Sequence, residues 1–395
     1  MYQLSTVRRN QTMTYKKIFT LALSVSAIAF ISQANAFETK AKNAILMDYE
    51  TGAYIFTKNH QQKIAPASMS KLMTLYELLT KIKEGDVSLE DTFKVSENAW
   101  RKGGAASGGS TMFLKIGQMV RVEDLIKGII IQSGNDACIV IAENLAGTEE
   151  EFASHMNETA EKIGLTNSHF VNATGLPHPE HKVSVEDLAK LARRIITEFP
   201  EYYHYFQEKQ FTYNGIKQGN RNPLLYSMNG ADGLKTGHTD EAGFCLTGSA
   251  VRSNRRLIEV VAGLESNKER SEESESLITW GFANFDNYKF FTKNQIIADV
   301  PVWYGTTESV QAVVPYDVVK TIKKSTKNKY SAKAIYHTPI KAPVIKGDEI
   351  GELIISYGDK NVQKVPLVAK DNVAKIGPVN RFFTNLKYFI FGNKE

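Results

Sequence analysis

Apolar residues recur at helical spacing in the first third of the chain. One stripe follows Pro66, a residue that suits the entry of a helix. Its members stand four and three positions apart, as residues on one face of a helix do: Leu72, Tyr76 and Leu79. The spacing predicts a helix over residues 68–79 that packs one face on a core.

Two apolar runs and two strand-like runs come later. Residues 125–131 and 137–142 are rich in apolar side chains and predict two core helices joined by a short loop. Residues 244–251 and 257–261 predict neighbouring strands. Long helices mixed with strand pairs favour an α/β sandwich in which helices pack on an antiparallel sheet. We place this domain at residues 37–297.

The pattern changes after residue 297. Short alternating runs separated by turn residues replace the helical spacing, at residues 298–302, 309–314, 333–336 and 350–357. They predict a small all-β domain, a β-sandwich over residues 298–372. This segment carries no candidate nucleophile with its base, so we expect it to act as a spacer or interaction domain.

The last segment, residues 373–395, has the pattern of an amphipathic helix. Its apolar residues follow helical spacing: Val379, Phe382, Phe383, Leu386, Phe389 and Ile390. Arg381 and Lys387 lie on other faces, and Lys375 and Lys394 flank the helix. A core helix of the preceding domain is the alternative, but a terminal helix this rich in phenylalanine and bordered by cations better suits the surface of an anionic bilayer. It is too short and too polar to span one.

Residues 1–36 have the composition of a secretory signal peptide. Lys16 and Lys17 precede an apolar run over residues 18–31, and Ala34-Asn35-Ala36 closes it with small residues at the cleavage spacing. Without this segment, which holds four cations and no acid, the net charge falls from +5 to +1. Nucleic-acid binding is therefore not indicated. A length of 395 residues suits two domains and leaves the oligomeric state open.

Three short motifs stand out for their chemistry and their order. Ser68-Met69-Ser70-Lys71 is an SxxK motif, Ser133-Gly134-Asn135 is an SxN motif, and Lys235-Thr236-Gly237 is a KTG motif. Each alone is common by chance. In this order they are typical of active-site serine acyl-transfer enzymes, namely penicillin-binding proteins and class A β-lactamases.

The first motif supplies a nucleophile and its base. A serine hydroxyl needs a base within hydrogen-bond reach, and residues three apart share one face of a helix, so Lys71 would lie beside Ser68. At the helix N-terminus, the backbone N–H of Ser68 and the helix dipole favour an oxyanion. Lys71 can act as a base only if burial or a neighbouring cation lowers its pKa from about 10.4. We expect Lys235 to be that cation.

Histidines and cysteines give no sign of a metal or another cofactor. His178 and His181 stand among prolines, without an acidic or cysteine partner at a ligand spacing, and we interpret them as loop residues. Export would permit a disulfide between Cys138 and Cys245, but both lie within apolar stretches, and we favour buried, unpaired thiols.

From about Lys40 to its C-terminus the chain resembles the D-alanyl-D-alanine carboxypeptidases, low-molecular-mass penicillin-binding proteins of the penicillin-binding protein 5 type and peptidase family S11. The segments that carry the resemblance are residues 65–74, 131–138, 220–222, 232–239 and 277–282. The resemblance implies a penicillin-binding protein fold and no cofactor. It implies that the partners are the pentapeptide stem of peptidoglycan and β-lactam antibiotics. It also implies a periplasmic enzyme attached to the outer face of the cytoplasmic membrane by its C-terminal helix.

The resemblance also implies roles for individual residues. Ser68 attacks the carbonyl of the penultimate D-alanine, D-alanine leaves, and water hydrolyses the acyl-enzyme. Lys71 is the base, and the rest of the catalytic network is Ser133, Asn135 and Lys235. The substrate-binding residues are Thr236, Gly237, His238, Arg270 and Arg221.

Within that set, the backbone N–H groups of Ser68 and His238 form the oxyanion hole. Thr236 and Arg270 receive the terminal carboxylate, for which a guanidinium is suited. From its residues alone, Arg270 lies in a charged stretch that could equally be a solvated helix face. Arg221 matches a further active-site arginine.

One position departs from the family. Relatives can carry a histidine where this chain has Thr174, which puts histidine-assisted deacylation in doubt. A serine β-lactamase, a DD-endopeptidase and a non-catalytic cell-wall scaffold remain as alternatives. A class A β-lactamase would need a well-placed glutamate, and Glu180 and Glu186 lie near but outside the expected motif.

Overall fold

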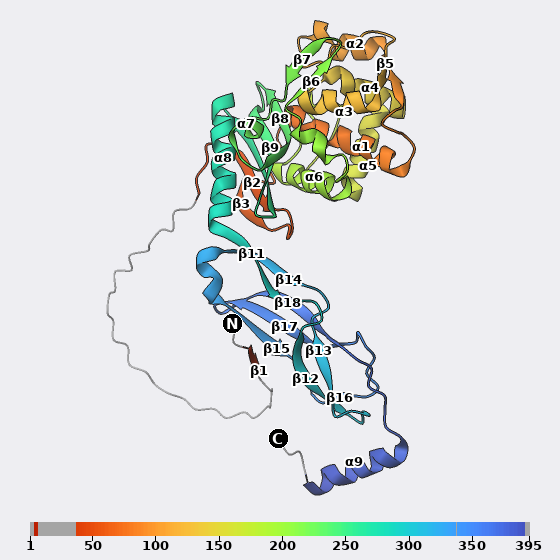
Figure 1. Ribbon diagram of the computed structural model, residues 1–395, viewed down its shortest axis with the longest axis vertical. Helices are drawn as coiled ribbons and strands as arrows, with labels where there is room; N and C mark the ends of the chain where they lie inside the picture. The colour runs from red at the N-terminus through yellow and green to blue at the C-terminus, as the bar shows by residue number, and fades with distance from the viewer. Residues whose placement is uncertain (1–3, 7–36, 337, 392–395) are drawn as a thin grey trace, which may run out of the picture. The chain divides into compact units, whose positions relative to one another are not determined.

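The computed structural model describes residues 4–6, 37–336 and 338–391 (Figure 1). The chain divides into two compact units, residues 35–284 and residues 285–395 together with 1–34. The predicted signal peptide, residues 1–36, lies outside the described residues except for β1 (Leu4–Thr6), which pairs in parallel with β15 (Tyr330–Ile335).

A five-stranded antiparallel sheet forms the centre of the first unit, with the strand order β3-β2-β10-β9-β8. Its strands are β2 (Asn43–Asp48), β3 (Tyr54–Lys58), β8 (Ala231–Thr239), β9 (Gly243–Arg252) and β10 (Arg255–Leu264). Two small ribbons accompany it, β4 (Thr92–Lys94) with β5 (Met119–Arg121) and β6 (Gln210–Tyr213) with β7 (Ile216–Gly219).

Helices cover both faces of this sheet (Figure 1). The α-helices are α1 (Lys71–Glu84), α2 (Glu97–Gly103), α3 (Val122–Ile131), α4 (Asn135–Ala146), α5 (Glu149–Lys162), α6 (Val185–Glu198), α7 (Leu224–Ser227) and α8 (Asn267–Asn284). Short 3-10 turns are η1 (Ala67–Ser70), η2 (Ala105–Ser107) and η3 (Tyr203–Gln207).

The alternation along β10 separates two apolar layers. Leu257 and Val261 pack in one cluster with Leu277 of α8, while Ile258 and Val260 belong to the larger cluster that the other helices complete. Successive strand residues point to opposite faces, so one strand serves both layers. The α/β sandwich predicted from the sequence is confirmed.

The second unit is built mainly of strands. Its larger sheet has the order β1-β15-β17-β18-β13-β12-β16, and a ribbon pairs β11 with β14. The bounds are β11 (Phe285–Phe291), β12 (Ile296–Trp303), β13 (Ser309–Val313), β14 (Val318–Lys323), η4 (Lys324–Lys329), β16 (Ile340–Lys341), β17 (Glu349–Tyr357) and β18 (Lys360–Ala369). The all-β fold predicted for this region is confirmed.

The boundary predicted at residues 297/298 falls inside β12. The second unit begins at Phe285 with β11, whose sequence FDNYKFF has no clear alternation of apolar and polar residues. Its strand character comes from pairing with β14, which periodicity cannot register.

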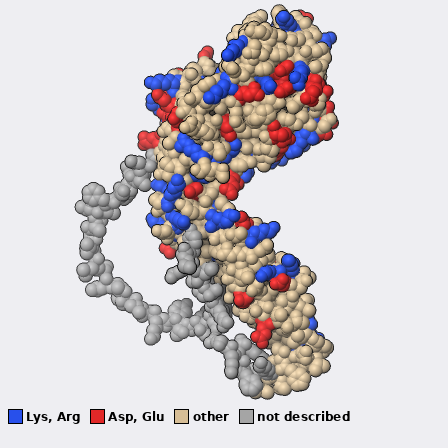
Figure 2. Space-filling model, in the orientation of Figure 1, with Lys and Arg blue, Asp and Glu red and all other residues tan. Residues whose placement is uncertain are grey.

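Helix α9 (Pro378–Phe391) ends the described chain. Its apolar residues are exposed, from 42% at Leu386 to 88% at Phe389. Figure 2 shows mostly uncharged surface at the end of the chain where Figure 1 places α9. Among the described residues, no helix combines the length and apolarity needed to cross a bilayer.

Candidate active site

The SxxK motif lies at the junction of η1 and α1. Residues three apart eclipse one another in a 3-10 helix, so the turn brings Ser68 and Lys71 to one side. The Lys71 Nζ atom lies 2.9 Å from Ser68 Oγ. Ser68 is partly exposed, and Lys71 is fully buried. The α-helix itself begins at Lys71, later than predicted, because the 3-10 turn takes the first positions.

Three oxygen atoms surround the Lys71 amine. As an ammonium, Nζ donates to Ser68 Oγ, to Asn135 Oδ1 at 2.7 Å and to the Thr174 carbonyl at 2.5 Å. The amide oxygen of Asn135 and the carbonyl of Thr174 can only accept hydrogen bonds. A neutral Lys71 therefore gives its two N–H groups to them and turns its lone pair toward the Ser68 hydroxyl. This is the geometry of a general base.

Burial lowers the pKa of Lys71 to about 8. Among the charges that lower it further, Arg221 leads. Burial, one of the two expected causes, is thus the larger one, and the cation named among the causes is Arg221 and not Lys235, the expected cation. A buried ammonium loses its hydration, and this loss outweighs the repulsion from a second cation.

The SxN motif joins α3 to α4, as the two apolar runs predict. Ser133 has a positive φ of 59°, a conformation that turns the chain sharply between the two helices. Asn135 is the first residue of α4. Ser133 Oγ accepts a hydrogen bond from Lys235 Nζ at 3.0 Å, so the second and third motifs meet.

Lys235 lies on β8, the edge strand of the sheet, and is almost fully buried. Its Nζ also donates to the Thr236 carbonyl at 3.1 Å. Burial lowers its pKa well below the usual value, and the positive charge of Lys71 adds to the effect. Two buried lysines that repel each other favour a state in which one of them is neutral.

Gly237 lets the edge strand approach residues 66–74, the nucleophile segment, which contain the SxxK motif. A Cβ atom at this position would lie 3.1 Å from both Ala67 Cβ and the Pro66 carbonyl. Thr236 beside it is buried, whereas His238 is exposed with its ring 3.9 Å from that of Phe244. The KTG motif thus presents its backbone beside η1.

Arg270 is not part of a solvated helix face. It projects from α8 and is 6% exposed, with its guanidinium over the ring of Phe244. Its NH1 atom donates to the carbonyls of Gly237 at 3.4 Å and Cys245 at 3.5 Å. Burial lowers the pKa of Arg270 to about 10. The cation therefore lies against the KTG strand, at the carbonyl of Gly237, the residue that follows Thr236.

Arg221 is exposed and donates to Ser110 Oγ. The neighbouring residues fix its segment, because Asn222 Nδ2 donates to the Gly233 carbonyl of β8 at 2.8 Å. The backbone N–H of Asn135 in turn donates to the Ser110 carbonyl. Arg221 thus connects the KTG strand to the loop that supports the SxN motif.

Thr174 takes part in the site through its backbone. Its carbonyl accepts from Lys71, while its hydroxyl donates to Asn172 Oδ1 at 2.9 Å within the loop. The side chain that departs from the family therefore faces the loop, and the Lys71 contact does not depend on it.

Sequence reasoning missed two contributors. His181, interpreted as a loop residue, is indeed outside the helices and strands, but it is buried with Nε2 2.7 Å from Ser70 Oγ of the SxxK motif. Asp136, also buried, accepts from Thr111 Oγ1 at 2.6 Å and from the Met112 N–H, which holds that loop on α4. The adjacency of Asp136 to the SxN motif was a usable signal; His181 gave none.

The described residues contain no group of three or more histidine, cysteine, aspartate or glutamate side chains able to hold a metal ion. Cys138 and Cys245 are buried free thiols. Burial raises the pKa of Cys138 to about 12, so this thiol is no nucleophile near neutral pH.

Fold and site together define a class, the active-site serine acyl-transfer enzymes with an SxxK nucleophile. Comparison with known families narrows the class. Residues 29–266 match the family described as D-alanyl-D-alanine carboxypeptidase, peptidase S11, and residues 285–375 match the penicillin-binding protein 5 C-terminal domain.

Individual relatives are similar to this chain over nearly its whole length. D-alanyl-D-alanine carboxypeptidase DacD of Salmonella typhimurium is 38% identical over 91% of this chain and 93% of its own length. The crystal structure of penicillin binding protein 5 from Haemophilus influenzae has a TM-score of 0.78 at 36% identity, covering 86% of this chain and 99% of its own. Penicillin binding protein 6B from Escherichia coli has a TM-score of 0.72 at 38% identity, covering 87% and 98%. The chain belongs to the peptidase S11 family of D-alanyl-D-alanine carboxypeptidases.

Proposed function

We propose that the chain is a serine-type D-Ala-D-Ala carboxypeptidase that removes the terminal D-alanine from peptidoglycan pentapeptide stems and is acylated by β-lactams. The observation that carries the proposal is the position of Lys71 Nζ, held by two pure acceptors and 2.9 Å from Ser68 Oγ. Family membership supplies the substrate class.

In the proposed acylation step, Lys71 takes the hydroxyl proton while Ser68 Oγ attacks the carbonyl of the penultimate D-alanine. The backbone N–H groups of Ser68 and His238 donate hydrogen bonds to that carbonyl oxygen and stabilise the negative charge that develops on it. Lys71 returns the hydroxyl proton through Ser133, which is bonded to Lys235, to the leaving amine, so that D-alanine departs and Lys71 is neutral again. Water activated by Lys71 then hydrolyses the ester.

The substrate carboxylate is proposed to bind between Thr236 and Arg270, with Arg221 at the margin of the site. Asn135 has a second task, because its Nδ2–H group can donate to the carbonyl of the substrate's peptide amide while Oδ1 orients Lys71. The buried guanidinium next to the KTG strand provides the positive charge that a C-terminal carboxylate requires.

The test combines a fluorescent penicillin with a peptide that ends in D-Ala-D-Ala. Wild-type protein should become labelled and release D-alanine, whereas Ser68→Ala should do neither and Ser331→Ala, an exposed serine on β15, should behave as wild type. Rapid penicillin turnover without D-alanine release would indicate a β-lactamase, and no label would favour a scaffold. Cleavage of a crosslinked peptide dimer would add endopeptidase action.

The pH dependence of labelling tests the base directly. Because the pKa of Lys71 is lowered to about 8, its neutral fraction falls as the pH drops below that value. The labelling rate should therefore rise with pH up to about 8 and level off above it. A rate that stayed constant between pH 6 and pH 9 would contradict Lys71 as the base.

We also propose that residues 1–36 direct export and that α9 attaches the enzyme to the outer face of the cytoplasmic membrane, with the second unit as a spacer. Six exposed apolar residues support the attachment: Val379, Phe382, Phe383, Leu386, Phe389 and Ile390. The family's work on the cell wall suits a location outside the cytoplasm.

Vesicle sedimentation tests the attachment. The signal-free protein should sediment with anionic vesicles, Phe389→Glu should reduce this strongly, and Thr384→Glu, on the opposite face of α9, should not. Equal sedimentation of Phe389→Glu and wild type would contradict the proposal.

A further inference from the structure

One loop, residues 170–181, contacts the nucleophile segment at residues 173–175 and again at His181. Three positions on that segment bond to it. Ser70 Oγ lies 2.7 Å from His181 Nε2, Lys71 Nζ lies 2.5 Å from the Thr174 carbonyl, and Thr74 Oγ1 lies 2.6 Å from the Ala173 carbonyl. The loop therefore supplies an acceptor to the base and is itself held next to it.

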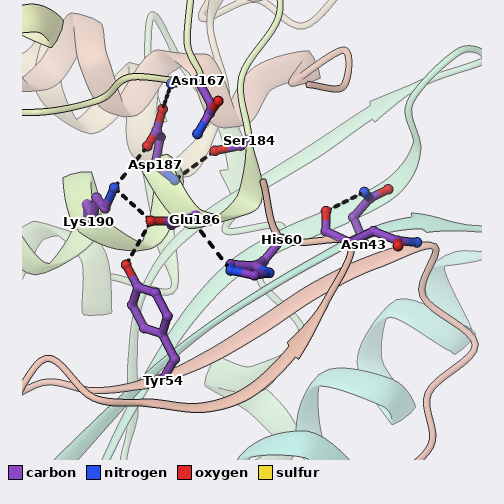
Figure 3. A network of polar contacts seen from close by, with 9 residues as sticks. Asn43, Tyr54, His60, Asn167, Ser184, Glu186, Asp187 and Lys190 are labelled. Atoms are coloured by element: carbon purple, nitrogen blue, oxygen red, sulfur yellow. Dashed lines mark hydrogen bonds and ion pairs between the residues drawn. The ribbon is translucent and has the colours of Figure 1, made fainter. Parts of the chain in front are cut away.

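The two ends of the loop are fastened to the rest of the first unit. His169 and Lys182 exchange two backbone hydrogen bonds, and the carboxylate of Asp187 on α6 accepts from the Asn167 N–H at 2.7 Å. Figure 3 shows Asp187 beside Glu186, with Lys190 bonded to both. This network fixes the two ends of the loop but does not reach Thr174.

The tip fits closely on the nucleophile segment. Gly175 has a φ of +75°, and a Cβ atom there would lie 2.0 Å from the Ala67 carbonyl. A small retreat of the tip would thus separate the Thr174 carbonyl from Lys71, because a hydrogen bond weakens steeply with distance.

His181 is placed to prevent that retreat. Its Nδ1 accepts from the Val171 N–H at 3.3 Å, so the proton of the neutral ring is on Nε2 and points at Ser70 Oγ. The ring is 1% exposed and packs edge-on against Phe170 at 5.8 Å. It is the side chain that bonds the loop to the SxxK motif.

We propose that His181 is a positioning residue for acylation. Its hydrogen bond to Ser70 holds the loop on the nucleophile segment and keeps the Thr174 carbonyl on Lys71. The inference rests on the proposed function, since it assumes that Lys71 is the base of Ser68.

The charges around the ring support a neutral His181. Burial is the largest cause of its lowered pKa, about 4, and His169, His178, Lys71 and Lys182 lower it further. All four of these neighbours are potential cations. The donor on Nε2 is therefore stable throughout the pH range in which Lys71 changes its protonation.

The experiment measures the second-order rate constant for labelling of Ser68 by a fluorescent penicillin from about pH 5 to pH 10. His181→Ala should react roughly tenfold more slowly at pH 7, a size typical of a misplaced catalytic group. Its rise with pH should also shift to higher pH, because a loosened loop hydrates Lys71 and burial is what lowers that pKa. Ser70→Ala removes Oγ, the partner of His181 in this hydrogen bond, and should shift the pH profile of the labelling rate in the same direction.

Two conservative variants test the direction of the bond. His181→Gln carries an N–H near the Nε2 position and should restore most of the rate, whereas His181→Asn carries its polar group near Nδ1 and should not. The matched control is His178→Ala, an exposed histidine of the same loop. Its rate and profile should equal those of the wild type.

Hydrogen exchange measures how firmly the loop is held, independently of the labelling reaction. The amides of Thr174 and Gly175 should exchange faster in His181→Ala and Ser70→Ala, but not in His178→Ala. A wild-type profile in His181→Ala, a loss that is equal at every pH, or equal rates for the Gln and Asn variants would overturn the inference. Failure of the proposed function looks different, since the wild type itself would remain unlabelled.

Discussion

The two compact units of this protein differ in what they bury. Among the described residues, the core of the second unit is wholly apolar, and every buried charged side chain lies in the first unit. Lys71, Lys235, Asp136, Glu259 and Arg270 are all below 7% exposed. Burying a charged side chain costs free energy, so its repeated occurrence in one unit indicates that a functional site lies in that unit.

The comparison also shows that buried charge alone does not mark a site. Lys71 donates to Ser68 of the SxxK motif, and Lys235 donates to Ser133 of the SxN motif. Glu259 is equally buried but lies in the apolar layer between β10 and α8. Hydrogen bonds to the serines of these motifs distinguish the two buried lysines from Glu259.

The largest expected effect comes from removing the buried base. Lys71→Met keeps the length of the side chain and should slow labelling by about a thousandfold or more. The free energy of unfolding should stay the same or rise, because an apolar chain replaces a buried amine. Labelling kinetics and chemical denaturation measure both. Lys364→Met, an exposed lysine of β18, should change neither quantity, and normal labelling of Lys71→Met would refute its role.

A cavity in the apolar core of the second unit should have the opposite effect: it should lower stability and leave the labelling rate unchanged. Leu353→Ala on β17 removes a fully buried side chain and should lower the free energy of unfolding of that unit by about 2–5 kcal/mol. Labelling of Ser68 should be unchanged. Hydrogen exchange resolved by unit checks the first part and labelling checks the second. Leu257→Ala on β10 is the matched change in the first unit, where exchange should rise instead.

Glu259 gives a pH test of burial without catalysis. Burial raises its pKa to about 8, and Ser274 on α8 offsets part of the rise. The unfolded pKa is about 4.3, so the folded state holds the proton more tightly. Stability from this group is complete below about pH 4 and is lost as the pH rises through 8. Denaturation midpoints of Glu259→Gln should lack this part of the pH slope, and identical slopes in both proteins would contradict the assignment.

The smallest effects compare two ion pairs. Arg256 and Asp232 in the first unit are 2.7 Å apart with side chains 16% and 12% exposed, whereas Lys364 and Glu352 in the second are 3.2 Å apart and 62% and 43% exposed. Double-mutant cycles should give a coupling of about 1.5–3 kcal/mol for the first pair and below about 1 kcal/mol for the second. Equal couplings would show that burial does not separate the units in this respect.

Much of this could be predicted from the sequence because the signals are local. The stripe from Leu72 to Leu79 lies in α1, the apolar runs lie in α3 and α4, and the KTG motif precedes β9 on an edge strand. The strand β11 was missed, because pairing with β14 rather than its own periodicity makes it a strand. The strand β18 was also missed, although Val365, Leu367 and Ala369 are buried at alternate positions.

The sequence by itself determined the three motifs and their order and thereby the candidate nucleophile, since residue type and short spacing are written directly in the chain. Only the tertiary structure decided that burial, more than Lys235, lowers the pKa of Lys71, and that Arg270 turns inward. It alone placed the Thr174 carbonyl, 103 residues away in sequence, on the Lys71 amine and His181 against Ser70. The physical reason is that desolvation and hydrogen bonding depend on which distant segments the fold packs together, and no local pattern records that.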